Sequence, residues 1–423
     1  MSWLSVVLSA RHDPVARILN VDLLAILIAI LLPWTTTGVA IVAVLWVIAL
    51  VPTLEVRSFL RSLTRPGSAF PIALFALALV GTLWADGPWP VRLHGIDPVA
   101  KLLAIPLLLY HFERSQRGLW VFAAFLLSCA LLMGLSWIVF FADVWKDEAG
   151  QTIGVPVKNS IDQSQEFVLC IFALASPAMT LFRQRRFALA AGCVALILGF
   201  CYNMMFVVLA RTALICMLAL TILFAVRHLN RGAVLLLLAG VTAIAALTWS
   251  ASPYLRQRVE HVAVEYREYK ETNYPTSTGQ RLAYWGLSIK SIGEAPLFGH
   301  GTGSTRLLFD REAAGKSGAW ADSITNPHNQ TLYVAVQWGA LGCFFLYAIW
   351  YFHLLLFREV SFAAWVGLVV VVQNVVSSLL NSHLFDFHEG WMYVLGVGVA
   401  GGMTLGAGRH QLTTLDSNTV RRS

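Results

Sequence analysis

Long apolar runs, separated by short polar segments, dominate this chain. Examples are LLAILIAILLPW, GAVLLLLAGVTAIAALTW and GCFFLYAIWYFHLLLF, and no stretch alternates apolar and polar residues over the length of a strand. Apolar runs of about 18 or more residues are typical of helices that cross a bilayer. The pattern predicts an all-α, polytopic membrane protein with about twelve spans. They are expected at residues 18–33, 36–53, 69–85, 97–112, 118–142, 163–182, 187–203, 206–226, 232–249, 329–352, 359–380 and 388–406.

The composition agrees with a position in a membrane. Of the 423 residues, 57% are hydrophobic and 13% are charged, whereas a soluble globular domain carries about 25% charged residues. The first apolar run, from about Ile18, is expected to remain as an anchor rather than to be cleaved. We therefore expect a lipid bilayer around the chain and no nucleic-acid partner.

Arginines predict the orientation of the spans. Both tails and several short loops carry arginines, and an even number of spans places all of them on one side. Because cytoplasmic loops are enriched in Lys and Arg, this side is expected to be cytoplasmic. The arginine-rich loops are 57–65, 114–117, 183–186 and 227–231. The opposite, periplasmic side then receives segments 84–97, 143–162, 250–328 and 381–387.

This layout divides the chain into three parts. Residues 1–249 hold the first nine predicted spans, residues 250–328 form a long periplasmic loop with amphipathic helices, and residues 329–423 hold the last three spans and a short cytoplasmic tail. The loop begins with PYLRQRVEHVAVEYREYKETNY, whose pattern predicts a charged amphipathic helix. This helix lies either at the membrane surface or in water, held by ordinary salt bridges.

Polar residues that hydropathy would not select gather on the expected periplasmic side. Arg211 interrupts the apolar run MMFVVLARTALICMLAL. An arginine at this depth is either a structural residue that extends to the interface or a fixed cation for an anionic ligand. The one-sided polarity predicts a polar cavity that opens outward. Its other candidate members are Lys101, Lys158, Asn159, His383 and Asp386.

A second arginine, Arg281, follows the charged helix in the motif GQRLAYW, which also contains Tyr284. A lone loop arginine is usually solvated. Here, however, PLFGHGTGS follows at 296–304 and includes Gly301 and Gly303. Such a turn can present backbone N–H groups to an anion. We therefore include these residues among the candidate contacts to an anionic substrate.

His328 lies in NPHNQTLYVAVQWGALG, where a polar segment changes into a predicted helix. Asn326 or Asn329 could cap this helix, and a cap alone would explain the motif. Alternatively, nearby arginines favour a neutral imidazole, which can accept a proton as a general base. Asn329 is then a further candidate contact to substrate.

The motif HLFDFHEG, at 383–390, contains residue types that could bind a metal ion. The chain has no Asp-x-Asp pair and no His-Glu-x-x-His pattern. We therefore expect no metal and no other cofactor. Asp386 is instead expected to orient His328 or an arginine.

Three of these motifs resemble the O-antigen ligase family, which shares a catalytic region with O-antigen polymerases and bacterial protein O-oligosaccharyltransferases. The motifs are LARTALI, GQRLAYW with PLFGHGTGS behind it, and NPHNQTLYVAVQWGALG. The resemblance is strongest over residues 200–345. It departs at Ala210, where the family often has serine, and at Gln337, where it often has glutamate. It implies a fold like that of GT-C-type membrane glycosyltransferases.

The resemblance implies a metal-independent transfer of O-antigen polysaccharide from undecaprenyl diphosphate to a sugar hydroxyl of lipid A-core. The reaction would take place at the periplasmic face of the bacterial inner membrane. Arg211 and Arg281 would hold the diphosphate, and His328 would take the proton of the acceptor hydroxyl in one inverting displacement. An O-antigen polymerase or a protein O-oligosaccharyltransferase would use the same residues with another acceptor. A transporter of lipid-linked glycans would use Arg211 without chemistry.

Overall fold

The computed structural model describes residues 14–142, 154–208, 210–318, 321 and 326–420, and all regular elements within these ranges are helices. The predicted all-α fold class is therefore confirmed. The helices are α2 (Pro14–Leu31), α3 (Thr36–Leu50), η1 (Val51–Thr53), α4 (Val56–Leu63), α5 (Pro66–Gly81), α6 (Trp89–His94), α7 (Asp97–Ala100), η2 (Lys101–Leu103), α8 (Ala104–Phe112), α9 (Gly118–Ala142), α10 (Ser160–Arg183), α11 (Phe187–Phe206), α12 (Arg211–His228), α13 (Arg231–Ala251), α14 (Pro253–Thr272), α15 (Ser277–Glu294), α16 (Ser304–Ala313), α17 (Gln330–Leu356), α18 (Phe362–Ser377) and α19 (Phe387–Val420).

Each of the twelve stretches expected to cross a membrane contains a helix. Among the described residues, nine helices are long and apolar enough to span a bilayer, or ten if the bent pair α4 and α5 forms one span. α18 is apolar but has only 16 residues. The chain is therefore a multi-pass membrane protein, and a total of twelve spans stays a prediction.

The break before α12 differs from the sequence prediction. The sequence predicts a turn near residues 201–203, but α11 continues past this point and α12 begins only at Arg211. Asn203 stays inside the helix because its side chain is bonded in the core: it donates to Ser136 Oγ (2.9 Å) and accepts from Gln163 (3.4 Å). As a result, Arg211 lies at a helix N-terminus rather than within a span.

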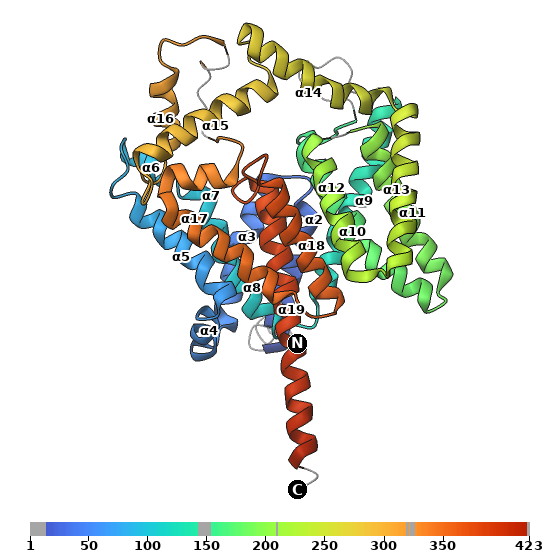
Figure 1. Cartoon of the computed structure of the whole chain (residues 1–423). Helices are drawn as coiled ribbons and strands as arrows, with labels where there is room; N and C mark the ends of the chain where they lie inside the picture. Colours follow the sequence, from blue (N-terminus) through green and yellow to red (C-terminus); the bar gives the residue numbers. More distant parts are fainter. Residues whose placement is uncertain (1–13, 143–153, 209, 319–320, 322–325, 421–423) are drawn as a thin grey trace.

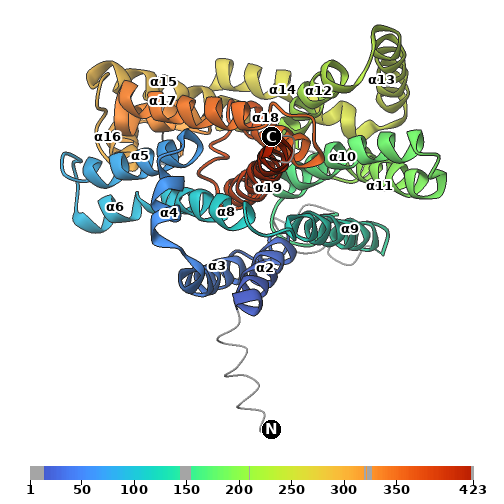
Figure 2. The same cartoon turned by 90° about the horizontal axis from the view of Figure 1, so that it is seen from below.

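α19 lies near the centre of the membrane helices. Figure 2 shows it between α8 and α17 on one side and α10 and α18 on the other. In the apolar 18-residue stretch of α19 within Phe387–Gly408, 78% of the residues are buried, whereas in that of α13 only 6% are. α13 thus exposes its apolar surface, as expected for a helix that faces lipid. Gly398 and Gly402 permit the close packing of α19 on α8, because an added Cβ would lie 2.4 and 2.6 Å from Leu108 and Phe112.

The three helices of the long segment lie at one end of the molecule. Figure 1 shows α14, α15 and α16 at this end, and α4 with the last part of α19 at the other. α14 confirms the helix predicted from PYLRQRVEHVAVEYREYKETNY, and α15 packs on α14 and α17. The end with α14 to α16 is the one expected to be periplasmic.

α17 is broken at Gly339, whose φ is +58°. Instead of bonding within the helix, the N–H groups of Ala340 and Leu341 donate to the carbonyl oxygens of Pro296 and Leu297, at 2.8 and 3.2 Å. A side chain at Gly339 would come within 2.4 Å of the Leu297 backbone, so the site requires glycine. The break lets the loop after α15 pack into α17.

Candidate functional site

His328 directly precedes α17 and has an unusual backbone conformation. Its φ is +54°, in the left-handed region that few residues other than glycine adopt. The side-chain oxygen of Asn326 accepts hydrogen bonds from the His328 N–H (2.9 Å) and from the Ser382 hydroxyl (2.6 Å). Backbone strain of this kind clusters at functional sites, where surrounding contacts hold it in place.

The imidazole of His328 lies against α15 and the segment after α18. The Tyr284 ring faces it at a tilt of 34°, with 6.4 Å between the ring centroids, and the Asn381 side chain is hydrogen-bonded to it. Burial and the charge of Arg281 lower the pKa of His328 to about 4, and the Asn381 hydrogen bond opposes this shift. The imidazole is therefore neutral at neutral pH and can accept a proton.

Arg281 and Arg211 come from different helices but lie next to the same polar pair. Arg281 of α15 donates to the side-chain oxygen of Asn381 (3.5 Å), and the Asn381 amide donates to Thr212 Oγ1 (3.4 Å), directly after Arg211. Burial and the charge of Arg211 lower the pKa of Arg281. Arg281 and His328 thus contact Asn381, Arg211 lies one residue before its third partner, and two neighbouring guanidinium groups favour an anion between them.

Arg211 is held by a carboxylate on α14. Its Nη1 and Nη2 bond to the two carboxylate oxygens of Glu265, at 3.0 and 3.4 Å, and Nη2 also donates to Ser277 Oγ (3.2 Å). Thr278 donates to Glu265 through its N–H (3.1 Å) and its hydroxyl. Burial raises the pKa of Glu265, but the hydrogen bonds from Arg211 and Thr278 outweigh it and leave the pKa below its usual value. Arg211 is therefore oriented by specific contacts within the protein.

Gly301 and Gly303 form a tight turn against α17. Their φ values are +88° and +81°, and their N–H groups donate to the backbone and side-chain oxygens of Gln337, both at 2.8 Å. In this conformation the two N–H groups are not presented to an anion, which differs from the sequence expectation. The turn instead positions the start of α16, and Gln337, a departure from the family pattern, is its acceptor.

Lys101 and Lys158 lie in a second, buried cluster. Lys101 Nζ donates to the carbonyl oxygens of Phe385 and Asp386, at 2.8 and 2.5 Å. Lys158 Nζ lies 2.8 Å from His388 Nδ1 and 3.5 Å from a Glu166 oxygen. The contacts of both ammonium groups thus lie in this cluster rather than between the two arginines.

Asn159 and Asn329 are helix caps. The Asn159 side chain accepts from Ile161 N–H (2.8 Å) and Asp162 N–H (2.9 Å) at the start of α10. The Asn329 side chain accepts from Leu332 N–H (3.1 Å) at the start of α17. The cap predicted within the histidine motif is therefore confirmed at Asn329. Contacts of either asparagine with substrate stay predictions.

Asp386 acts on His328 through Asn326. One carboxylate oxygen of Asp386 accepts from the Asn326 amide at 3.2 Å, and Asn326 in turn bonds the backbone N–H of His328. Asp386 thus supports the residue that fixes the His328 backbone. Asp386 therefore supports His328 as predicted, but it does so through Asn326 rather than by direct contact.

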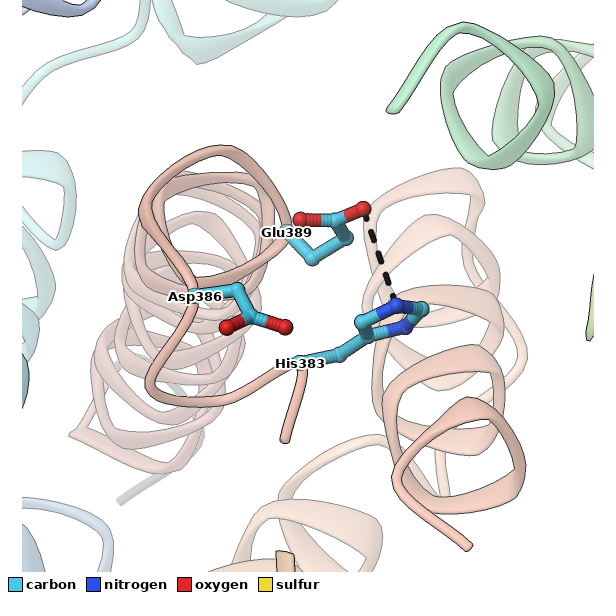
Figure 3. Close-up of side chains that lie close together, drawn as sticks. All are labelled: His383, Asp386 and Glu389. Atoms are coloured by element: carbon cyan, nitrogen blue, oxygen red, sulfur yellow. Dashed lines mark ion pairs between the residues drawn. The ribbon is translucent and has the colours of Figure 1, made fainter. Parts of the chain in front are cut away.

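His383, Asp386 and Glu389 lie close together in the buried cluster, as Figure 3 shows. His383 Nε2 is 3.7 Å from Glu389 Oε1, and one potential ligand atom from each residue lies within 4.8 Å of the others. These residue types could hold a divalent cation. Lys101, however, already provides a positive charge at the Asp386 carbonyl. The expectation of a metal-free site stays a prediction.

The fold and this arrangement define a multi-pass membrane protein in which an arginine and a neutral histidine contact one asparagine, with a second arginine beside them. Residues 194–347 match the sequence model of the family described as O-antigen ligase, the family that the three motifs resemble. The members of this family are glycosyltransferase-like enzymes. The match contains Arg211, Arg281 and His328, whereas Asn381 and Asp386 lie outside it. No curated protein matches the chain.

Two residues of the site, Glu265 and Asn381, were not singled out from the sequence. Asn381 lies just before the HLFDFHEG motif, where no helix or catalytic pattern marks it. Glu265 lies in a helix with many charged residues, and its i, i+4 spacing from His261 is the only pattern that marks it.

Proposed function

We propose that this protein is an O-antigen ligase. It transfers O-antigen polysaccharide from undecaprenyl diphosphate to a sugar hydroxyl of lipid A-core at the periplasmic face of the bacterial inner membrane, and both tails lie in the cytoplasm. The observation that carries the proposal is the meeting of Arg281 and His328 at Asn381, beside Arg211. The family match supports the reaction class.

The arginines stabilise the leaving group. When the bond between the sugar and the diphosphate breaks, negative charge accumulates on the departing phosphate oxygens. Fixed guanidinium groups stabilise such charge most effectively where little water is present, and their fork of N–H groups matches phosphate oxygens. Arg281 and Arg211 repel one another, and a diphosphate between them removes this repulsion. The two residues replace the divalent cation that would otherwise neutralise the diphosphate.

His328 is the general base. Its neutral imidazole takes the proton of the acceptor hydroxyl while the hydroxyl oxygen attacks the anomeric carbon from the face opposite the diphosphate. One bond forms as the other breaks, so the configuration inverts. In the donor-free protein, burial and, after it, the charge of Arg281 keep the pKa of His328 low. The negative charge of a bound diphosphate offsets Arg281 and makes the imidazole a stronger base when it is needed.

The proposal is tested by transfer in vitro. The purified protein in lipid nanodiscs receives a lipid-diphosphate donor and either lipid A-core or a second lipid-linked glycan, with EDTA present. Glycosylation of lipid A-core is expected. Extension of only the lipid-linked glycan would identify a polymerase, and the absence of transfer by the wild-type protein to either acceptor would overturn the proposal.

A further inference from the structure

A pocket of about 300 Å³ lies beside Arg211 and below one face of α14. It is lined by Arg211, Tyr254, Gln257, His261 and Glu265. The four residues from α14 are spaced i, i+3, i+7 and i+11, so they form one stripe along the helix. At a rise of 1.5 Å per residue, this stripe is about 16 Å long.

Two residues of the stripe, Gln257 and His261, make no polar contact with the described residues that would stabilise the fold of α14. The side chains of Gln257 and His261 are exposed, and no hydrogen bond joins either of them to the described part of the chain. α14 is instead held by Leu255, which is buried, and by Glu265, which pairs with Arg211. Gln257 and His261 are therefore available to a ligand, and their replacement should leave α14 in place.

The chemistry of the pocket fits a carbohydrate. The carboxylate of Glu265 disfavours a second anion, and the polar stripe disfavours a hydrocarbon chain. Amide, imidazole and carboxylate groups together offer donors and acceptors, which suits sugar hydroxyl groups, since each of these both donates and accepts. The Tyr254 ring adds an apolar face with a polar tip.

We propose that this pocket is a glycan subsite for the donor, and that it takes the sugars that follow the one attached to the diphosphate. This inference rests on the proposed function, because a diphosphate between Arg211 and Arg281 would bring the sugar chain next to α14. Arg211 belongs to both places: its guanidinium lines the pocket and lies within the field of Arg281. The reacting sugar lies at His328, and the next sugars follow the stripe.

Two donors test the subsite. One is undecaprenyl diphosphate with a single sugar, and the other carries several repeat units that begin with the same sugar. In the double variant Gln257→Ala/His261→Ala, the KM for the long donor should rise about ten-fold, since two hydrogen-bonding side chains are lost. The kcat for the long donor and both constants for the single-sugar donor should stay unchanged.

The matched control is Tyr266→Ala/Lys270→Ala on the opposite face of α14. These side chains are exposed, and the Lys270 ammonium lies 6.0 Å from the Tyr266 ring centroid. This variant should behave like the wild type with both donors. An unchanged KM for the long donor in Gln257→Ala/His261→Ala, or an equal loss with both donors, would overturn the subsite. Failure of the wild type to use either donor would instead overturn the proposed function.

Discussion

Glu265 holds the guanidinium of Arg211 with both of its carboxylate oxygens, at 3.0 and 3.4 Å. The positive charge of Arg211, which we propose binds the diphosphate of the donor, is thus already paired with a carboxylate inside the protein. Because a guanidinium carries five N–H donors, Arg211 can keep Glu265 and still bond a phosphate oxygen. Glu265 then fixes the direction of the arginine before the donor arrives.

Replacement of Glu265 should loosen the outer end of the molecule. Glu265→Ala removes the acceptor of Arg211 and of Thr278, so α14 loses its ion pair to α12 and keeps only the hydrogen bond to its backbone from Thr276, at the start of α15. We expect faster amide hydrogen exchange in α14 and in the turn at 273–276, together with slower glycan transfer. Glu260→Ala, at an exposed glutamate of the same helix that does not line the pocket, should change neither. Wild-type exchange in Glu265→Ala would contradict this role of the ion pair.

His328→Ala should remove the general base. Loss of a general base lowers kcat by about 10²- to 10⁴-fold, and the variant should still insert into the membrane. His328→Gln should lose as much activity, although an amide retains hydrogen-bonding capacity toward Asn381. His94→Ala, at a histidine whose side chain is 86% exposed, is the control and should be fully active. Wild-type transfer by either His328 variant would refute the assignment.

Lysine should not replace Arg281. A lysine keeps the positive charge but offers no planar fork for two phosphate oxygens. Arg281→Lys is expected to lower kcat/KM by about 10- to 100-fold, the effect of losing a charge-assisted hydrogen bond. Arg306→Lys, at an exposed arginine of α16, is the control and should leave kcat/KM unchanged. Full activity of Arg281→Lys would show that position 281 requires only a positive charge and not the planar guanidinium.

The pH dependence should reveal the effect of Arg281 on His328. Burial and Arg281 lower the pKa of His328 to about 4. The neutral, active form is present above this pKa and is lost as the pH falls through it. The acid limb of kcat/KM, which reports the free enzyme, should therefore lie well below the usual histidine value of about 6.5.

The acid limb of kcat should lie at higher pH than that of kcat/KM, since the bound diphosphate offsets Arg281. His383, whose pKa burial also lowers to about 4, titrates in the same range. His383→Gln should leave both limbs in place. If the acid limb disappears in His383→Gln, the titration belongs to His383 and not to His328.

Removal of metal ions should not stop transfer. The two arginines supply the positive charge that the diphosphate requires, so dialysis against EDTA is expected to leave the rate unchanged. A loss of activity that Mg²⁺ or Mn²⁺ restores would contradict this expectation. It would point to His383, Asp386 and Glu389, whose ligand atoms lie within 4.8 Å of one another, and Glu389→Gln should then also be inactive.

The helices could be predicted because the bilayer acts directly on the sequence: each long apolar run becomes a helix. The misplaced break near residues 201–203 has a non-local cause, since Asn203 is satisfied by Ser136 and Gln163 on neighbouring helices. Hydropathy reports the depth of a residue but not the direction in which it points. For this reason it groups Lys101 and Lys158 with the residues of the candidate site, although the two lysines belong to a separate cluster.

Those residues of the site that lie within a short recognisable motif could be predicted from the sequence. Arg211, Arg281 and His328 each lie in a recognisable stretch and come together in the structure. Glu265 and Asn381 depend on contacts between segments far apart in the chain. Several glutamates share α14 with Glu265, and only the packing of α14 against α12 and α15 distinguishes it from them.

The break at Gly339 divides α17 into an outer piece, residues 330–338, and a longer second part, residues 340–356. The outer piece, which follows His328, accepts hydrogen bonds at the carbonyl oxygens of Val336 and Gln337 from the N–H groups of His300 and Gly301, in the loop that leaves α15, the helix of Arg281. The first residues beyond the break, Ala340 and Leu341, donate to the carbonyl oxygens of Pro296 and Leu297 in the same loop. The helices that carry His328 and Arg281 are thus joined to one another by the hydrogen bonds of this loop. A side chain at position 339 would press on the Leu297 backbone in this loop, so it should alter the spacing between the imidazole and the guanidinium.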